Sequence, residues 1–238
     1  MICLHAKIHL CEDVFFASVE IGRFYQTYPV IGNYALAYAL GLVHSKYHDE
    51  NSHPSYVEDF QKINEQGIYI TPAQPIFSQK IIYSFHTFNA LNDRYYFKMD
   101  KAEYNYPRMG KVRTLAPENI FEFFLFFEKE RIFLPNYIRL GKWMSKAKVT
   151  YSKVNCYPLE ENTYFSSQIL TPIDFSSDTK ILEGAYISMY PTPLLKKSRF
   201  RGKAWKIEIN KENDIYIFLP QNMKFAQRFI SEKYSIQT

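Results

Sequence analysis

The segment Ile2-Cys-Leu-His-Ala-Lys-Ile-His-Leu10 alternates apolar with polar side chains along its whole length. Because successive side chains on a strand point to opposite faces, this period of two predicts a half-buried strand. Farther along, Pro29 opens the apolar segment 30–43, which is rich in Ala, Leu and Tyr and closes near Gly41. Apolar residues nearly all round predict a buried helix, entered at Pro29 or capped by Asn33. A strand followed by a buried helix indicates an α+β fold.

The remainder of the chain predicts mainly strands and one further short helix. Ser55-Tyr-Val-Glu58 matches a capping box and starts a helix that Gly67 stops. Ile120–Phe127 is the strongest buried-strand run. The other predicted strands cover 14–19, 67–71, 81–88, 95–99, 112–116, 148–155, 186–190, 205–209 and 215–219, and an amphipathic helix is predicted at 223–234. No repeat or linker interrupts this order, so we expect one α+β domain over residues 1–238, with insertions.

Composition narrows the class of protein. Lys and Arg number 29 against 24 Asp and Glu, and this net charge of +5 is by itself weak evidence for a polyanionic partner. Aromatic residues make up 18% of the chain, which favours strands and supplies rings on which bases could stack. Cys3, Cys11 and Cys156 are odd in number and far apart, which suits a reduced cytoplasm better than a disulfide framework or a structural zinc site. With no signal peptide and no membrane-length apolar stretch, we expect a cytoplasmic protein.

The segment Ile138-Arg-Leu-Gly-Lys-Trp-Met-Ser-Lys-Ala-Lys148 is basic and contains no acid. Its cations, which could neutralise phosphates, are Arg139, Lys142, Lys146 and Lys148. Gly141 would allow close approach of a ligand to the backbone, Trp143 offers a stacking face, and Ser145 a hydroxyl for phosphate oxygens. The combination indicates single-stranded nucleic acid, with a solvated loop around a half-buried Trp as the alternative.

Two further segments have the same character. The turn-forming Pro107-Arg-Met-Gly-Lys-Val-Arg113 presents Arg108, Lys111 and Arg113. Leu195-Lys-Lys-Ser-Arg-Phe-Arg-Gly-Lys-Ala-Trp-Lys206 presents Lys196, Lys197, Arg199, Arg201, Lys203 and Lys206, with Phe200 and Trp205 between them. A charged run is often only a solvated face. Three such runs in a chain of +5 nevertheless indicate that the positive charge is concentrated.

Catalytic and metal sites are not expected. His44, His48 and His53 share a loop with acidic residues but form only a loose ligand set, and His5 and His9 are too far apart along a strand to share an ion easily. The chain has no glycine-rich phosphate loop and no nucleophile elbow. For metal-free RNA cleavage, His86, Tyr83 or Lys142 could be offered as the base, although such residues occur in any chain of this composition. We therefore predict no catalytic residue, no metal and no cofactor.

Several long blocks resemble a known family. They are Phe15-Phe-Ala-Ser-Val-Glu-Ile-Gly-Arg23, Pro29-Val-Ile-Gly-Asn-Tyr-Ala-Leu-Ala-Tyr-Ala-Leu-Gly41, Tyr69-Ile-Thr-Pro-Ala73, Phe88-Asn89 and Ile138-Arg-Leu-Gly-Lys-Trp-Met-Ser-Lys-Ala147. The chain, up to about residue 150, is similar in these blocks to the Csc-one family, the Cas-five-like subunits of type I-D CRISPR effector (Cascade) complexes. The resemblance implies a RAMP-type, ferredoxin-like (RRM-related) domain with an antiparallel sheet, an inserted hairpin "thumb" and a β-rich C-terminal extension. We place the thumb at 74–113 and the extension at 156–238.

The resemblance also implies a role in binding and assembly. Such a subunit is expected to hold the 5′ handle of the CRISPR RNA and to contact the large subunit and the first backbone subunit. Arg139, Lys142, Trp143 and Lys146 are the first candidates for the handle, with Arg23 as a second-line candidate ahead of the helix. The 196–206 run could face the same RNA, target DNA beside the flanking motif, or a neighbouring subunit. Two alternatives stay open: a metal-independent endoribonuclease acting on repeat RNA, and a protein-only scaffold.

Overall fold

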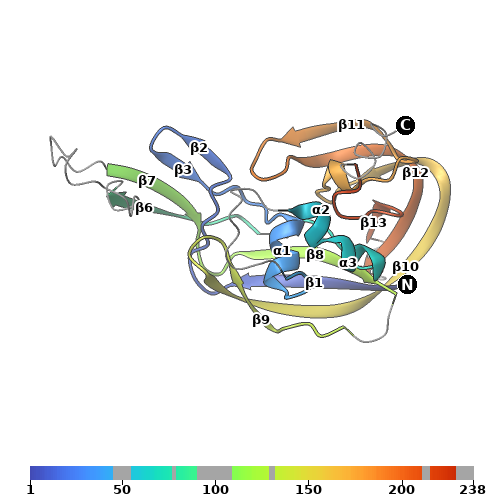
Figure 1. The fold of residues 1–238 in the computed structure, drawn as a ribbon, viewed down its shortest axis with the longest axis horizontal. Coiled ribbons are helices and arrows are strands. Elements are labelled where there is room, and N and C mark those ends of the chain that lie inside the picture. Colours follow the sequence, from blue (N-terminus) through green and yellow to red (C-terminus); the bar gives the residue numbers. More distant parts are fainter. Residues whose placement is uncertain (45–54, 77–78, 90–108, 129–131, 211–214, 229–238) are drawn as a thin grey trace.

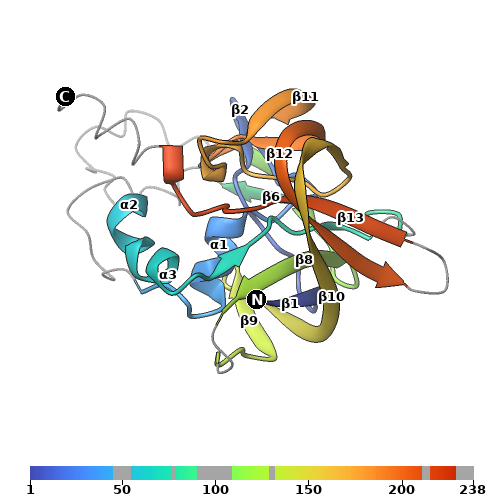
Figure 2. The ribbon, with the colours of Figure 1, turned by 90° about the vertical axis from the view of Figure 1, so that its right-hand side faces the viewer.

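The computed structural model describes residues 1–44, 55–76, 79–89, 109–128, 132–210 and 215–228 (Figure 1). Strands dominate, in one sheet of nine and one of four. Three short helices, α1 (Asn33–Ala39), α2 (Tyr56–Asp59) and α3 (Gln61–Glu65), lie together on one side of the larger sheet (Figure 2). The predicted α+β class with a mainly antiparallel sheet is confirmed. No helix within these residues is long and apolar enough to span a membrane.

Strand β1 (Ile2–Leu10) lies at the centre of the larger sheet, between β8 (Ile120–Phe127) and β10 (Ser145–Ser166). On its inner face Ile8 is opposite Phe121 of β8 and Val149 of β10, and all three side chains are buried. Further pairing comes from β4 (Tyr69–Ile70) and β5 (Gln74–Pro75) on β8, and from β9 (Tyr137–Leu140) on β10. Ala6, Ile8 and Leu10 therefore face the core, as the alternation predicts, but Cys3 and His5 on the opposite face are also buried.

The unusually long β10 joins the two halves of the larger sheet. Its first part pairs with β1 and its second part pairs with β12 (Leu194–Asn210), which also pairs with β11 (Lys180–Ile187) and β13 (Ile215–Pro220). Figure 2 shows the curved β10 running from beside β1 to β12 and β13. A strand of this length must coil, because strands twist with a fixed hand.

The smaller sheet has the order β2 (Val19–Ile21), β3 (Phe24–Gln26), β7 (Met109–Leu115), β6 (Tyr83–Asn89). The β6–β7 pair projects from the body of the molecule (Figure 1). Apart from the last two residues of β7, this pair falls within the segment 74–113, the predicted thumb. It joins the smaller sheet, whereas β5 at the start of the same segment pairs with β8 in the larger sheet. Residues 90–108 between the two strands, including the predicted strand 95–99, lie outside the described residues.

A fully buried carboxylate ties the C-terminal segment to the helices. Asp174, in the 3-10 turn Pro172–Asp174, accepts hydrogen bonds from Asn33 Nδ2 (2.7 Å), the hydroxyls of Tyr34 (2.6 Å) and Tyr69 (3.0 Å), and Ala226 N (3.0 Å). Burial raises the pKa of Asp174 to about 6, although these four donors favour the charged form and oppose the shift. The carboxylate thus joins α1, β4 and residue 226.

The structure corrects several predicted boundaries. Segment 14–19 is not a strand, because apart from β2 only Val14 forms an isolated bridge, to Leu115. The β2–β3 hairpin lies between β1 and α1 in the chain. Helix α1 is shorter than the predicted helix 30–43. Residues 223–226 of the predicted terminal helix are not helical and instead bury Phe225 in the core, while the part from 229 onward is not described.

Candidate nucleic-acid interface

The β9–β10 hairpin presents its cations on one exposed face. Register places Arg139 opposite Lys146 and Tyr137 opposite Lys148, and all four side chains are exposed. The intervening Ile138 and its neighbours on the other face are buried, so the alternation directs the charges outward. Lys146 Nζ lies 4.6 Å from the centre of the Tyr137 ring, a cation–π contact. Cations beside an exposed ring are what binding of a single-stranded polyanion requires.

The tight turn of this hairpin packs against its own chain. Gly141 has φ +70°, and a Cβ there would lie 2.3 Å from the carbonyl oxygen of Phe15. Lys142 N also donates to that oxygen, at 2.8 Å. The close approach that glycine permits is therefore to the Phe15 backbone, and the predicted ligand approach at Gly141 is wrong.

Trp143 is half-buried, which was the stated alternative to a fully open stacking face, and Ser145 is buried, contrary to its prediction. The Trp143 ring is 46% exposed and leans on Phe15 and, edge-on, on His86, each with centroids 5.2 Å apart. It can offer a ligand only part of its surface. Ser145 is buried and its hydroxyl donates to the carbonyl of Asp13 at 2.6 Å, so the prediction that it binds phosphate does not fit the structure.

One acid reaches this face from outside the basic segment. Glu12 follows β1, and its Oε2 lies 3.7 Å from Arg139 Nη1 and accepts a hydrogen bond from Lys146 N at 2.7 Å. Arg139 also donates to the carbonyl of Met144 at 3.2 Å. Glu12 therefore offsets the positive charge of Arg139. The side-chain ammonium groups of Lys146 and Lys148 have no carboxylate within 4 Å among the described residues.

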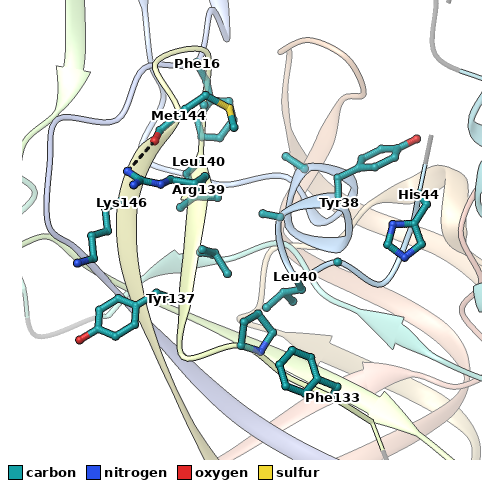
Figure 3. A pocket seen from close by; sticks show the side chains of 16 residues that line it. Phe16, Tyr38, Leu40, His44, Phe133, Tyr137, Arg139, Leu140, Met144 and Lys146 are labelled. Carbon is teal, nitrogen blue, oxygen red and sulfur yellow. Dashed lines mark hydrogen bonds between the residues drawn. The ribbon is translucent and has the colours of Figure 1, made fainter. Parts of the chain in front are cut away.

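An apolar groove of about 810 Å³ separates this hairpin from α1 (Figure 3). Apolar side chains such as Phe16, Leu40 and Leu140 form much of its lining. Tyr137, Arg139 and Lys146 of the cationic face also belong to this lining (Figure 3). The cationic face of the hairpin therefore borders the groove.

The second basic segment lies on the smaller sheet. Lys111 and Arg113 are on β7, and Lys111 N donates to the carbonyl of Arg23 at 2.9 Å, which brings that second-line candidate to the same sheet. Arg23 is in the β2–β3 turn, and the prediction that it directly precedes the helix is wrong. Arg108 lies outside the described residues.

The third basic segment is paired with acids. On β12, Arg199 lies 3.7 Å from Glu183, Arg201 lies 3.4 Å from Glu161, and Lys203 lies 3.9 Å from Glu160. Lys206 Nζ lies 3.6 Å from the centre of the Tyr216 ring. Lys196 and Lys197, both exposed, have no carboxylate within 4 Å in the described chain. This run therefore carries less free charge than its sequence suggests.

Two of the residues offered for acid–base chemistry, Tyr83 and His86, do not converge. Tyr83 and His86 are separated by an odd number of positions on β6, so they lie on opposite faces of that strand. His86 Nε2 lies 3.6 Å from Asp13 and its ring contacts Trp143, whereas the Tyr83 ring receives the guanidinium of Arg113 at 4.6 Å.

The histidines that were considered as metal ligands are also dispersed. No cluster of three or more His, Cys, Asp or Glu side chains occurs in the part of the chain that the structure describes. His5 Nε2 contacts Glu122 at 3.0 Å, and His44 lines the groove, while His48 and His53 are not described. Cys3 and Cys156, far apart in sequence, come near one another because β1 and β10 are neighbours.

Comparison with known proteins gives a family match over almost the whole chain. A family model described as type I-D CRISPR-associated protein Cas5/Csc1 matches residues 1–228. No curated protein sequence matches. Among solved structures, a chain of the cryo-EM structure of the Type III-B Cmr-beta bound to cognate target RNA and AMPPnP has a TM-score of 0.48 and 12% identity, over 83% of this chain and 86% of that chain. A CRISPR protein from Archaeoglobus fulgidus has a TM-score of 0.39 and 11% identity, over 92% of this chain and 99% of its own.

Proposed function

From the chain's membership of the type I-D CRISPR-associated Cas5/Csc1 family, we propose that it is a non-catalytic, RNA-binding subunit of a type I-D interference complex. Family membership makes it a subunit of a CRISPR complex. The proposal adds that it caps the 5′ handle of the CRISPR RNA and contacts the large subunit and the first backbone subunit. The handle phosphates would lie along the exposed face of the β9–β10 hairpin.

The observation that carries the proposal is the pair Lys146 and Lys148. Both are exposed on the same face of β10, and they lie roughly 6.8 Å apart, two residues along a strand. Neither ammonium group has a carboxylate within 4 Å among the described residues, and the Tyr137 ring lies beside them. Uncompensated cations release bound counterions when they meet phosphates, and this release dominates the affinity of proteins for nucleic acid.

The same reasoning ranks the three basic segments. The 196–206 run has more cations, but three of them have carboxylates within 4 Å. Phosphate binding there would have to displace those carboxylates, which cancels much of the gain. The β9–β10 face therefore supports the proposal better than the longer run does.

The test is a double charge reversal with a matched control. Lys146→Glu with Lys148→Glu should weaken binding of the full chain to a handle RNA, because two phosphate contacts are lost. Each contact to a single strand contributes about 0.7 to the slope of log affinity against log salt, so the slope should fall by about 1.4. Fluorescence anisotropy with labelled RNA at several salt concentrations gives this slope.

The control is Arg201→Glu with Lys203→Glu, which makes the same charge change on β12. Because these cations already face Glu161 and Glu160, the slope should stay near that of the unmodified chain. Equal losses in the two double variants would show that only net charge matters, and would refute the assignment to the β9–β10 face.

Two experiments address the alternative functions. Incubation of the purified chain with repeat RNA in EDTA tests the endoribonuclease alternative, since site-specific cleavage abolished by His86→Ala would contradict a binding-only role. For the scaffold alternative, we expect that guides lacking the 5′ handle fail to recruit this subunit to the assembled complex. Recruitment by such guides at the normal level would support a protein-only scaffold.

A further inference from the structure

The outward face of the smaller sheet presents an exposed ring beside cations. Phe85 on β6 is 69% exposed and lies directly opposite Arg113 on β7. One pair farther along the same face, Lys111 lies opposite Thr87 on β6 and Phe24 on β3. Phe85 lies on the edge strand of this sheet, with its ring open to solvent beside these cations.

The other face of the same strands is already used for packing. His86 packs edge-on against Trp143 and lies 3.6 Å from Asp13, and Thr114 Oγ1 lies 3.3 Å from the Asp13 carboxylate. Val112, next to Arg113, is buried. The β6–β7 pair is therefore held to the body through one face at this level, and Phe85 is held in place on the other.

Arg113 is oriented but not neutralised. Its guanidinium carbon lies 4.6 Å from the centre of the Tyr83 ring, and Nη2 donates to Gln26 Oε1 at 2.9 Å. Neither contact removes charge, and no carboxylate pairs with Arg113 or Lys111 among the described residues. Two fixed contacts reduce the entropy that this side chain would lose on binding a ligand.

A second Phe–Arg pair on neighbouring strands has an acidic residue beside its Arg, so its charge is offset. On the β10–β12 surface the exposed Phe165 lies directly opposite Arg199, as Phe85 does opposite Arg113. There, however, Glu183 lies 3.7 Å from the guanidinium. The two pairs share geometry and residue types but differ in net charge, so of the two only the Phe85 pair combines an open ring with free cations.

We propose that the Phe85 face of the smaller sheet binds one unpaired base of single-stranded RNA. The base would stack on Phe85, and Arg113 and Lys111 would bind the phosphates on either side of it. These two cations are roughly 6.8 Å apart on β7, a spacing that can serve adjacent phosphates. The exposed Thr87 hydroxyl can hydrogen-bond a ribose 2′-hydroxyl, which favours RNA over DNA. The inference rests on the proposed function in taking RNA as the ligand, and adds a second contact region to it.

Substitution of Phe85 tests the stacking. Phe85→Ala should weaken binding of the full chain to an unstructured handle RNA by roughly 5-fold to 100-fold, the range seen when an aromatic under a base is truncated. Phe85→Tyr keeps the ring and should bind like the unmodified chain, whereas Phe85→Leu keeps apolar area but not the stacking face and should resemble Phe85→Ala. Because Phe85 is exposed, unfolding midpoints should be equal in all variants.

Phe165→Ala is the matched control and should leave RNA affinity unchanged. Equal affinities of Phe85→Ala and the unmodified chain would overturn the inference, as would equal losses in both Phe variants. If DNA of the same sequence binds as tightly as RNA and is equally sensitive to Phe85→Ala, the assignment to RNA is wrong. If Phe85→Ala has no effect while Lys146→Glu with Lys148→Glu does, this inference fails and the proposed function stands.

Discussion

Replacing Gly141 by alanine should destabilise the protein more than the same change at other glycines with positive φ. At φ +70° an alanine pays roughly 1 kcal/mol for the left-handed conformation. Its Cβ would also lie 2.3 Å from the backbone oxygen of Phe15, which cannot turn away as a flexible side chain can. The turn must therefore move. That movement breaks the hydrogen bond from Lys142 N, worth about 1 kcal/mol. It also disturbs the Trp143–Phe15 ring contact, worth roughly 1 kcal/mol.

The expected total is about 3 kcal/mol of unfolding free energy, the sum of these three effects. Urea denaturation monitored by tryptophan fluorescence measures it, and Trp143 itself reports on the turn. Gly22→Ala is the matched control, because its φ is +61° but a Cβ added there would meet no heavy atom within 4 Å. It should cost only about 1 kcal/mol. If the two variants lose the same stability, the packing of this turn against Phe15 contributes nothing and the reasoning is refuted.

Two further predictions concern buried polar groups. Ser145→Ala should lower the unfolding free energy by about 1 kcal/mol, since it removes the hydrogen bond to the Asp13 carbonyl. RNA affinity should stay unchanged. A large loss of affinity would restore the phosphate-binding role of Ser145. Asp174→Ala should cost roughly 3 kcal/mol or more, because four buried donors lose their acceptor. For the unmodified chain, the pKa of Asp174 rises from 3.8 to about 6 on folding, so the native state binds more protons between these values. The contribution of Asp174 to stability should therefore fall as pH rises from about 4 to about 6, by at most about 3 kcal/mol, and Asp174→Ala should lack this component; urea titrations at several pH values measure it.

Local patterns predict the strands well where one face is buried. Ile2–Leu10 and Ile120–Phe127 form the strands that their side-chain patterns indicate, because alternation and apolar runs record burial directly. The predicted helix at 30–43 is too long, since apolar residues beyond Ala39 are buried without being helical. The segment around Phe225 has the amphipathic pattern of a helix, but Phe225 is buried in the core without being helical.

The charge environment of each cation cannot be predicted from its own segment. The 138–148 run contains no acid, yet Glu12 lies beside Arg139, because β1 and β10 are neighbours and β1 leads into residue 12. Phe85 has no local signal that marks it as exposed. Both facts depend on strand register between segments far apart in sequence, which periodicity within one segment does not contain.

Strand β10 divides the surface into two electrostatic regions. Its first part carries Lys146 and Lys148 outward without carboxylate partners among the described residues, whereas its second part carries Glu160 and Glu161, which face the cations of β12. An RNA strand attracted to the first region would meet carboxylates if it continued along the second. This difference in charge between the two parts of β10 therefore favours an RNA path from the β9–β10 face toward the smaller sheet. There, Arg113 and Lys111 also have no carboxylate partner within the described residues. Trp143, which contacts both Phe15 and His86 of β6, lies where the hairpin meets that sheet and would border such a path.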